Sequence, residues 1–400
     1  MIALQRTSWF KCCVGAMIPA CIGAVAVQSV RAQEPPVAAT QPAEEAVDDM
    51  LAAAREAMAN NKPDEAAEHF QRAMQKDPGN VFALAGMGQV KLAQQAPVDA
   101  MRFFMQAADK AIDLEYFAMA EQLVEQVLTI DPNNAEALAG QGRVLAETGR
   151  NVQAIEAYQR YLKTGDMEKR DRAYLALGRL YAKGRYPRQA VSMLRKAEQL
   201  NPQDAEIQGM LAVALQGIGR LDEASGCADR AIQLDPENAE YYRTRASILL
   251  SLNKPNDAEQ AVREGLNMAR SQLRATPGDA ELLENISELH KSLQAVLQAR
   301  LAGEPENANL LLELARSITE AASIQQTATL HEALRVMTDA ARYAEKDPAI
   351  LIELATLQFQ VYKRADAAAT CKKILALDAN HAGARSLLEQ IGPITTQPAP

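Results

Sequence analysis

Apolar and small residues return along most of the chain at intervals of three and four, which is the spacing of one face of an α-helix. The clearest stretch, residues 171–202, predicts two short helices joined by a turn at 183–185. The inward positions of this helix pair are Tyr174, Leu177, Gly178, Tyr181, Ala190, Leu194 and Ala197. The alternation typical of β-strands is missing between the turn signals, so the sequence predicts an all-α protein.

Two small residues of this stretch are expected to allow close packing of the two helices. We expect Gly178 and Ala190 to lie where the two helices cross, because a larger side chain there would hold the backbones apart. A glycine inside an isolated helix costs about 1 kcal/mol relative to alanine. Close packing is therefore the natural explanation for Gly178.

A proline recurs at the junctions between such units. It stands at Pro78, Pro132, Pro202, Pro236, Pro277, Pro305 and Pro348, with Ala379 in the last place. The step from Pro202 to Pro236 is 34 residues. A fixed period of this length is the signature of an array of stacked repeats, which usually offers a surface to partners.

The unit at 171–202 resembles the tetratricopeptide repeat family. The family's pattern of a bulky residue, Leu-Gly, Tyr, Ala, a large apolar residue, Ala and Pro is met by Tyr174, Leu177, Gly178, Tyr181, Ala190, Leu194, Ala197 and Pro202. The resemblance covers residues 47–391 and is strongest over 135–265. It implies a right-handed superhelix (an α-solenoid) of stacked antiparallel helix pairs, with the first helix of each pair lining a concave, partner-binding face.

The period is broken in three places. The interval from Pro78 to Pro132 leaves room for an extra helix, which we place at 114–130, and the helix beginning near Asp257 runs long, to about Ala275. Residues 280–302 then repeat apolar positions in steps of four and three, at Leu282, Ile286, Leu289, Leu293 and Val296. This segment is either a short coiled-coil seam or a long core helix of the array.

The N-terminus is typical of a secretory signal peptide. Arg6 and Lys11 precede an apolar run at 12–30, and Val30-Arg31-Ala32 offers a small-residue cleavage pattern. An uncleaved membrane anchor is the alternative. Cleavage after Ala32 would leave Cys227 and Cys371, which we expect to be buried singly rather than joined in a disulfide.

Composition and the breaks in the repeat divide the rest of the chain. The predicted organisation is a signal peptide at 1–32, a disordered linker rich in Pro, Ala and Glu at 33–46, an N-terminal array at 47–267, an irregular long-helix segment at 268–304, C-terminal repeats with a capping helix at 305–392, and a disordered tail at 393–400. We place the capping helix at 384–391.

Charge is unevenly distributed. The formal net charge is −9, which argues against general binding to nucleic acid. Lys and Arg counted against Asp and Glu give −11 for residues 33–142, +8 for 143–196 and −8 for 197–288. One basic band therefore lies between two acidic ones.

The basic band supplies the candidate partner-binding residues. In the geometry that the resemblance implies, one concave surface would receive Arg143, Arg172, Arg179 and Lys183. Such a groove could hold an acidic peptide, a C-terminal carboxylate or an anionic polysaccharide. The alternative is a solvated surface on which these side chains pair with acids close by in sequence, namely Glu147, Glu168 and Asp171.

The sequence offers no catalytic, cofactor or metal motif. None of the four histidines has another His or Cys within four residues, and after His331-Glu332 the position of a second zinc ligand holds Arg335. Glycine-rich phosphate loops and Gly-x-Ser-x-Gly nucleophile motifs are missing. We therefore expect no enzymatic activity, no metal and no cofactor.

Together these features predict an exported protein-binding scaffold or assembly factor of a bacterial envelope, in the periplasm or outside the cell. The expected partner is a protein or peptide, and a second copy of the chain is one option. Membrane contact is expected only if the signal segment is retained as an inner-membrane anchor. Two alternatives remain open. One is a structural component that self-associates through residues 280–302 or its terminal helices; the other is an anionic-glycan-binding part of surface-polysaccharide machinery.

Overall fold

The computed structural model describes residues 46–325 and 330–392, and within these ranges the protein contains α-helices and no β-strand. The predicted fold class, an all-α solenoid of stacked antiparallel helix pairs, is confirmed. The predictions for the signal peptide, the linker and the C-terminal tail fall almost entirely outside the described residues.

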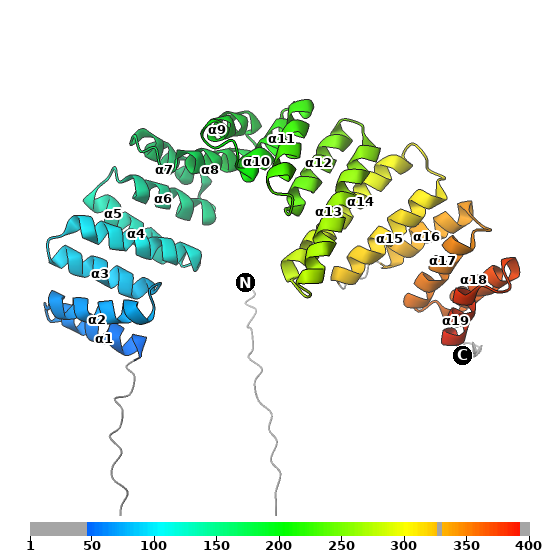
Figure 1. The fold of residues 1–400 in the computed structure, drawn as a ribbon, viewed down its shortest axis with the longest axis horizontal. Helices are drawn as coiled ribbons and strands as arrows, with labels where there is room; N and C mark the ends of the chain where they lie inside the picture. The colour runs from blue at the N-terminus through cyan, green and yellow to red at the C-terminus, as the bar shows by residue number, and fades with distance from the viewer. Residues whose placement is uncertain (1–45, 326–329, 393–400) are drawn as a thin grey trace, which may run out of the picture. The chain divides into compact units, whose positions relative to one another are not determined.

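The helices follow one another in chain order, as the colours of Figure 1 show. The helices are α1 (Val47–Ala59), α2 (Pro63–Lys76), α3 (Val81–Ala93), α4 (Pro97–Asp113), α5 (Phe117–Ile130), α6 (Ala135–Glu147), α7 (Asn151–Lys163), α8 (Arg170–Lys183), α9 (Pro187–Leu200), α10 (Ala205–Gly217), α11 (Leu221–Leu234), α12 (Ala239–Ser251), α13 (Pro255–Ala275), α14 (Ala280–Leu301), α15 (Ala308–Gln325), α16 (Leu330–Tyr343), α17 (Pro348–Gln360), α18 (Arg364–Leu377) and α19 (Ala382–Ile391).

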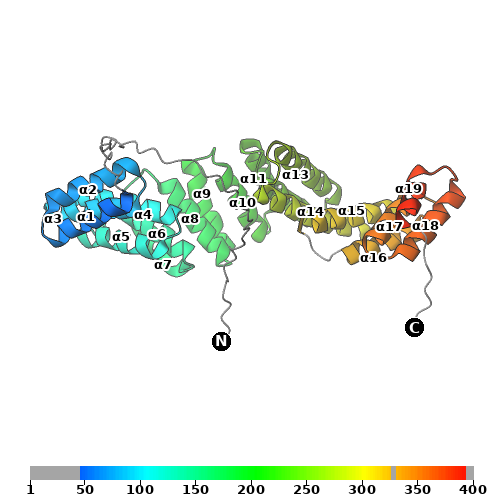
Figure 2. The same cartoon turned by 90° about the horizontal axis from the view of Figure 1, so that it is seen from below.

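Local sequence signals set where many of these helices begin. Several first helices start after an Asn or Asp whose side chain accepts a hydrogen bond from a free backbone N–H, as Asn80, Asn134 and Asp204 do before α3, α6 and α10. Several second helices instead start with proline, which has no N–H to satisfy; Pro187 at the start of α9 is one. Each helix then packs against its neighbours in the chain, and Figure 2 shows the same order of helices from below.

The unit at 171–202 folds as predicted. Its helices are α8 and α9, and Leu177, Ala190 and Leu194 are almost completely buried between them. Gly178 lies against Leu194: a Cβ at position 178 would stand 2.5 Å from Leu194 Cγ. The side chain of Leu194 on the second helix therefore occupies the space beside Gly178 on the first helix.

The irregular intervals contain the expected extra helical segments. The predicted additional helix is α5, which begins at Phe117 rather than Leu114 because Glu115 adopts a left-handed turn conformation (φ 60°). The helix expected to run long is α13, which ends at Ala275. The predicted capping helix is α19, with Ala384, Leu387 and Ile391 buried against the preceding pair.

Residues 280–302 form a core helix of the array. In α14 the positions Ile286, Leu289, Leu293 and Val296 are buried at 6% exposure or less, and α14 packs against α12, α13 and α15. The coiled-coil interpretation is therefore wrong for these positions, because their apolar face is already covered by helices of the same chain. These four side chains are therefore not available for contact with a second copy of the chain.

Both cysteines of the described part are buried and unpaired, as expected. Burial raises the thiol pKa of Cys227 and of Cys371, so both side chains behave as small apolar groups. Among the helices that the structure describes, none combines the length and apolar character needed to cross a bilayer.

Candidate functional site

The predicted basic groove corresponds to a cavity of about 420 Å³ on the first-helix surface of α6, α8 and α10. Three of the four predicted residues line it: Arg143 from α6, and Arg172 and Arg179 from α8. Lys183 is exposed at the C-terminal end of α8, one turn beyond Arg179, and lies outside the lining. The structure thus brings the three arginines together from two successive repeats.

The cavity opens where the stacking of repeats is loosest. The junction between α7 and α8 is a loop at 164–169 without the usual proline, and α6 and α8 approach each other less closely than α8 and α10 do. Lys169 closes this loop with a backbone N–H that donates to the Tyr161 hydroxyl at 3.2 Å. The longer junction separates α6 from α8 and leaves room between them.

Each arginine pairs with an acid of the neighbouring repeat. Arg143 Nη1 lies 2.8 Å from Asp109 Oδ1, which is 34 residues earlier in the chain. On the other side, Arg172 Nη1 lies 3.3 Å from Asp204 Oδ2, and Arg179 pairs with Glu206 at the start of α10. The basic band is therefore held between acids from the two acidic bands that flank it in the sequence.

These partners differ from the acids that sequence proximity suggested. Of those, Asp171 accepts a hydrogen bond from Asn201 Nδ2 at 3.2 Å instead. Pairing across the stack is favoured because residues one repeat apart occupy equivalent positions on adjacent helices. The three guanidinium side chains remain 46–61% exposed, so a partner can still reach them.

The cavity also has an apolar wall. Ala139, Ala173 and Ala176 line it, beside the ring of Tyr158 from α7. Burial raises the pKa of Tyr158 to about 12, so this phenol stays neutral at ordinary pH. The site therefore offers cationic edges next to a neutral, mostly apolar floor.

A second cavity continues the same row of first helices. It measures about 480 Å³ and lies between α10, α12 and α14, with Val213 and Gln216 on one side and Glu240, Arg243 and Glu288 among its polar lining. Val213, at 42% exposure, adds an apolar side chain to the wall of this cavity. The two cavities share α10, so they form neighbouring parts of one surface.

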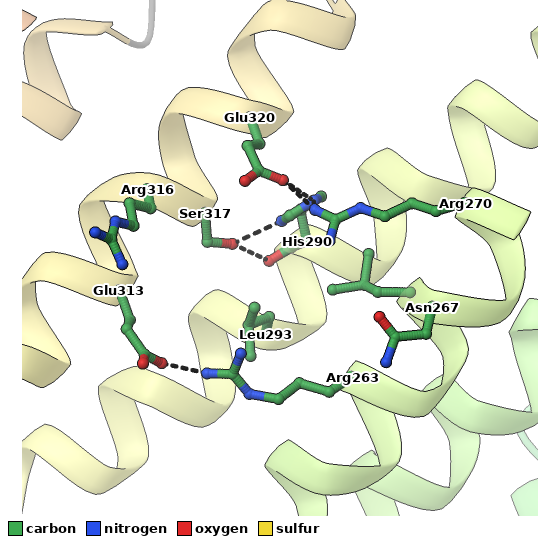
Figure 3. A pocket seen from close by; sticks show the side chains of 10 residues that line it. Arg263, Asn267, Arg270, His290, Leu293, Glu313, Arg316, Ser317 and Glu320 are labelled. Atoms are coloured by element: carbon green, nitrogen blue, oxygen red, sulfur yellow. Dashed lines mark hydrogen bonds and ion pairs between the residues drawn. The ribbon is translucent and has the colours of Figure 1, made fainter. Parts of the chain in front are cut away.

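A third cavity, of about 280 Å³, lies between α13 and α15 with α14 as its floor (Figure 3). Two ion pairs, Arg263–Glu313 and Arg270–Glu320, join α13 to α15, the two helices that form the walls of this cavity. In each pair the partners are fifty residues apart, and the two arginines lie two helical turns apart on α13. The pairs therefore tie α13 to α15 at two levels.

His290 lies beneath these ion pairs and is only 2% exposed. Its Nδ1 is 3.1 Å from Ser317 Oγ, and its Nε2 is 3.0 Å from Glu320 Oε2 and 3.4 Å from Arg270 Nη2. Burial lowers the pKa of His290 and outweighs the opposing effect of Glu320. His290 is therefore a neutral, hydrogen-bonded link between α14 and α15.

Sequence reasoning missed this cluster. It treated His290 only as a failed metal ligand, and the cluster joins residues that are about 20 to 50 positions apart. The seven-residue spacing shared by Arg263 and Arg270 on one helix and by Glu313 and Glu320 on another could have indicated it. In the ranges that the structure describes, no group of three or more His, Cys, Asp or Glu side chains could hold a metal ion.

Among curated proteins, a DnaJ homolog subfamily C member 7 homolog of Schizosaccharomyces pombe is 26% identical over 49% of the chain and 37% of its own length. A peroxisomal targeting signal receptor of Komagataella phaffii is 24% identical over 49% of the chain and 32% of its own length. The chain thus spans about a third of the length of these relatives.

Solved structures with similar folds include MamA from Desulfovibrio magneticus, which is 19% identical, covers 43% of the chain and 96% of its own, and has a TM-score of 0.41. YrrB, described as a TPR protein with an unusual peptide-binding site, is 19% identical over 55% of the chain and 97% of its own, with a TM-score of 0.38. Sequence models of the tetratricopeptide repeat match residues 57–120 and 180–248, and a related one matches 105–168. With these matches and its row of stacked helix pairs, the chain belongs to the tetratricopeptide repeat proteins.

Proposed function

We propose that this protein is an exported scaffold or assembly factor that holds a segment of a partner protein against the first helices α6, α8 and α10. As a tetratricopeptide repeat protein the chain is a scaffold for protein interactions. The observation that carries the more specific proposal is the 420 Å³ cavity lined by Arg143, Arg172 and Arg179. We propose no catalytic step for it.

The charges around the cavity favour a peptide of mixed character over a polyanion. Every one of the three arginines already has a carboxylate partner in the chain, so a ligand carboxylate must compete with Asp109, Asp204 or Glu206. The apolar wall beside them gives a peptide a second source of binding free energy. An anionic polysaccharide would gain little binding free energy from that apolar wall. We therefore favour an acidic peptide with apolar side chains over a glycan.

Location is part of the proposal. The apolar run at 12–30 with its cleavage pattern supports export. Burial of Cys227 and Cys371 as single thiols is compatible with an oxidising compartment, because neither thiol is exposed to form a disulfide. We therefore propose a bacterial envelope as the place of action, and intact-mass measurement of the protein from its native cells tests it: a chain beginning at Gln33 supports export, and one beginning at Met1 contradicts cleavage.

Binding is tested by removing the three arginines. We expect Arg143→Gln, Arg172→Gln and Arg179→Gln together to abolish most chemical crosslinks between the protein and its partner in native cells, with little change in melting temperature because exposed ion pairs contribute only about 0 to 1 kcal/mol each. A matched control replaces Arg195, Arg230 and Arg263, which form ion pairs on second helices. Equal crosslinking by wild type and by the first variant would place the binding surface elsewhere.

A further inference from the structure

The turn between α8 and α9 exposes a group of cationic and aromatic side chains. Lys183, Arg185 and Arg188 are all exposed, and Tyr186 between them is 56% exposed. They lie within six residues at the edge of the array where first helices turn into second helices. This edge is separate from the first-helix cavity between α6 and α10.

In three equivalent turns the basic residue is paired with an acid, whereas in two others, at Lys254 and Lys363, it forms no ion pair in the part of the chain that the structure describes. Lys62 pairs with Glu65, Arg150 with Glu121, and Arg220 with Glu223. Within the described part of the chain, no ion pair is formed by Lys183, Arg185 or Arg188. Three cations of the basic band therefore lie together without ion-pair partners at this edge, whereas the three arginines of the cavity are paired.

A depression of about 420 Å³ lies next to these side chains, between this turn and the following one. Arg185 and Arg188 line it together with Tyr186, Pro187, Gly217 and Ile218. Its wall is thus part cationic and part apolar. An apolar side chain can enter it while carboxylates on either side meet the two arginines.

We propose that this edge, comprising Lys183, Arg185, Tyr186 and Arg188, is a second docking surface that binds an acidic protein segment carrying an apolar anchor residue. Charge complementarity supports this occupant, because three unpaired cations favour carboxylates. The apolar part of the depression favours a protein segment over a purely ionic surface such as a lipid headgroup layer. The inference does not depend on the cavity between α6 and α10.

The test uses the full chain and a short fluorescent peptide of alternating glutamate and leucine, followed by anisotropy. We expect Lys183→Gln, Arg185→Gln and Arg188→Gln together to weaken binding about tenfold at low salt. The matched control, Lys62→Gln, Arg150→Gln and Arg220→Gln, removes the same charge from the same edge but from paired residues, and should change binding by less than about twofold. Tyr186→Ser, which keeps every charge, should also weaken binding.

Each other outcome overturns the proposal. Equal losses in both triple variants would mean that only net charge matters, and no loss in the first variant would leave the turn a solvated surface. Binding to phosphatidylserine vesicles without binding to the peptide would identify a membrane surface instead. Loss of peptide binding only in the Arg143, Arg172 and Arg179 variant would place the peptide in the first-helix cavity, which separates this test from that of the proposed function.

Discussion

Neighbouring helices are held together by different contacts in the pair α8–α9 and in the three helices α13, α14 and α15. In the regular pair, Gly178 leaves space for Leu194, and the helices are 14 residues long. In the irregular segment the helices have 18 to 22 residues, and polar links at His290 and two ion pairs add to the apolar contacts.

The difference shows what a repeat gains from small residues. A close crossing buries apolar surface in a short helix, so the regular unit needs few polar contacts. The long helices are held together by apolar contacts over a greater length and by charges that join α13 to α15 across α14. The regular unit should therefore be sensitive to added volume, and the irregular segment to lost hydrogen bonds and to pH.

The largest expected effect is in the regular unit. Gly178→Leu should lower the free energy of unfolding by about 3 kcal/mol, because the new side chain must displace Leu194. Urea denaturation followed by circular dichroism measures it. The control is Gly226→Leu in α11, where no atom lies within 4 Å of an added Cβ and leucine is a better helix former, so stability should stay equal or rise. Equal losses in both variants would show that Gly178 does not sit at a crossing.

The next effect is in the irregular segment. Ser317→Ala removes the hydroxyl beside His290 Nδ1 and should cost about 1 to 2 kcal/mol, because a buried polar atom loses its partner. Ser323→Ala on the same helix is the control, since that hydroxyl is exposed and bonds only to the Thr319 carbonyl. Two indistinguishable unfolding curves would mean that the His290 contact does not hold α14 to α15.

Acid should weaken the irregular segment in particular. Burial holds the pKa of His290 below its ordinary value of 6.5, with Ser317, Glu320 and Arg270 facing the ring. The unfolded chain therefore takes up this proton more readily, and stability falls as pH drops through about 6.5 towards the lower folded-state pKa. His290→Asn should show a shallower loss of melting temperature across this range than the wild type. If melting temperature falls equally with pH in the two proteins, protonation of His290 is not the cause of the loss of stability.

The smallest effect is expected from one ion pair across the third cavity. Glu313→Gln breaks the Arg263–Glu313 pair and should cost at most about 1 kcal/mol, since both side chains are more than a third exposed. Raising the salt concentration should narrow the difference from wild type. A loss as large as that of Gly178→Leu would mean that charges, rather than apolar burial, hold the long helices together.

The helices were predictable because each carries its own apolar face and start signal, as in the unit with Leu177 and Leu194. The start of α5 was misplaced by three residues because the left-handed turn at Glu115 carries no glycine. The convergence of Arg143, Arg172 and Arg179 was expected from the geometry that the family resemblance implies, but their partners were not. Asp109 and Glu206 lie on other repeats, and only the stacking of repeats brings them near.

The cluster around His290 was not predicted either, because its residues lie far apart in the sequence and meet only when the helices stack. Its members come from α13, α14 and α15, and the long helices there interrupt the period that aligned the other repeats. Likewise, Lys183 was grouped with the cavity from its spacing along α8. Only the end of that helix at Lys183 shows that the side chain lies beside the turn.

Site-specific photocrosslinking in the native cells tests the central claim, that the first helices α6, α8 and α10 hold the partner. A photoreactive residue replaces Ala176 in the cavity in one protein and the exposed Gln233 on α11 in another. The account predicts a discrete adduct with one protein partner from position 176 and none from position 233. An adduct from position 233 alone would contradict it.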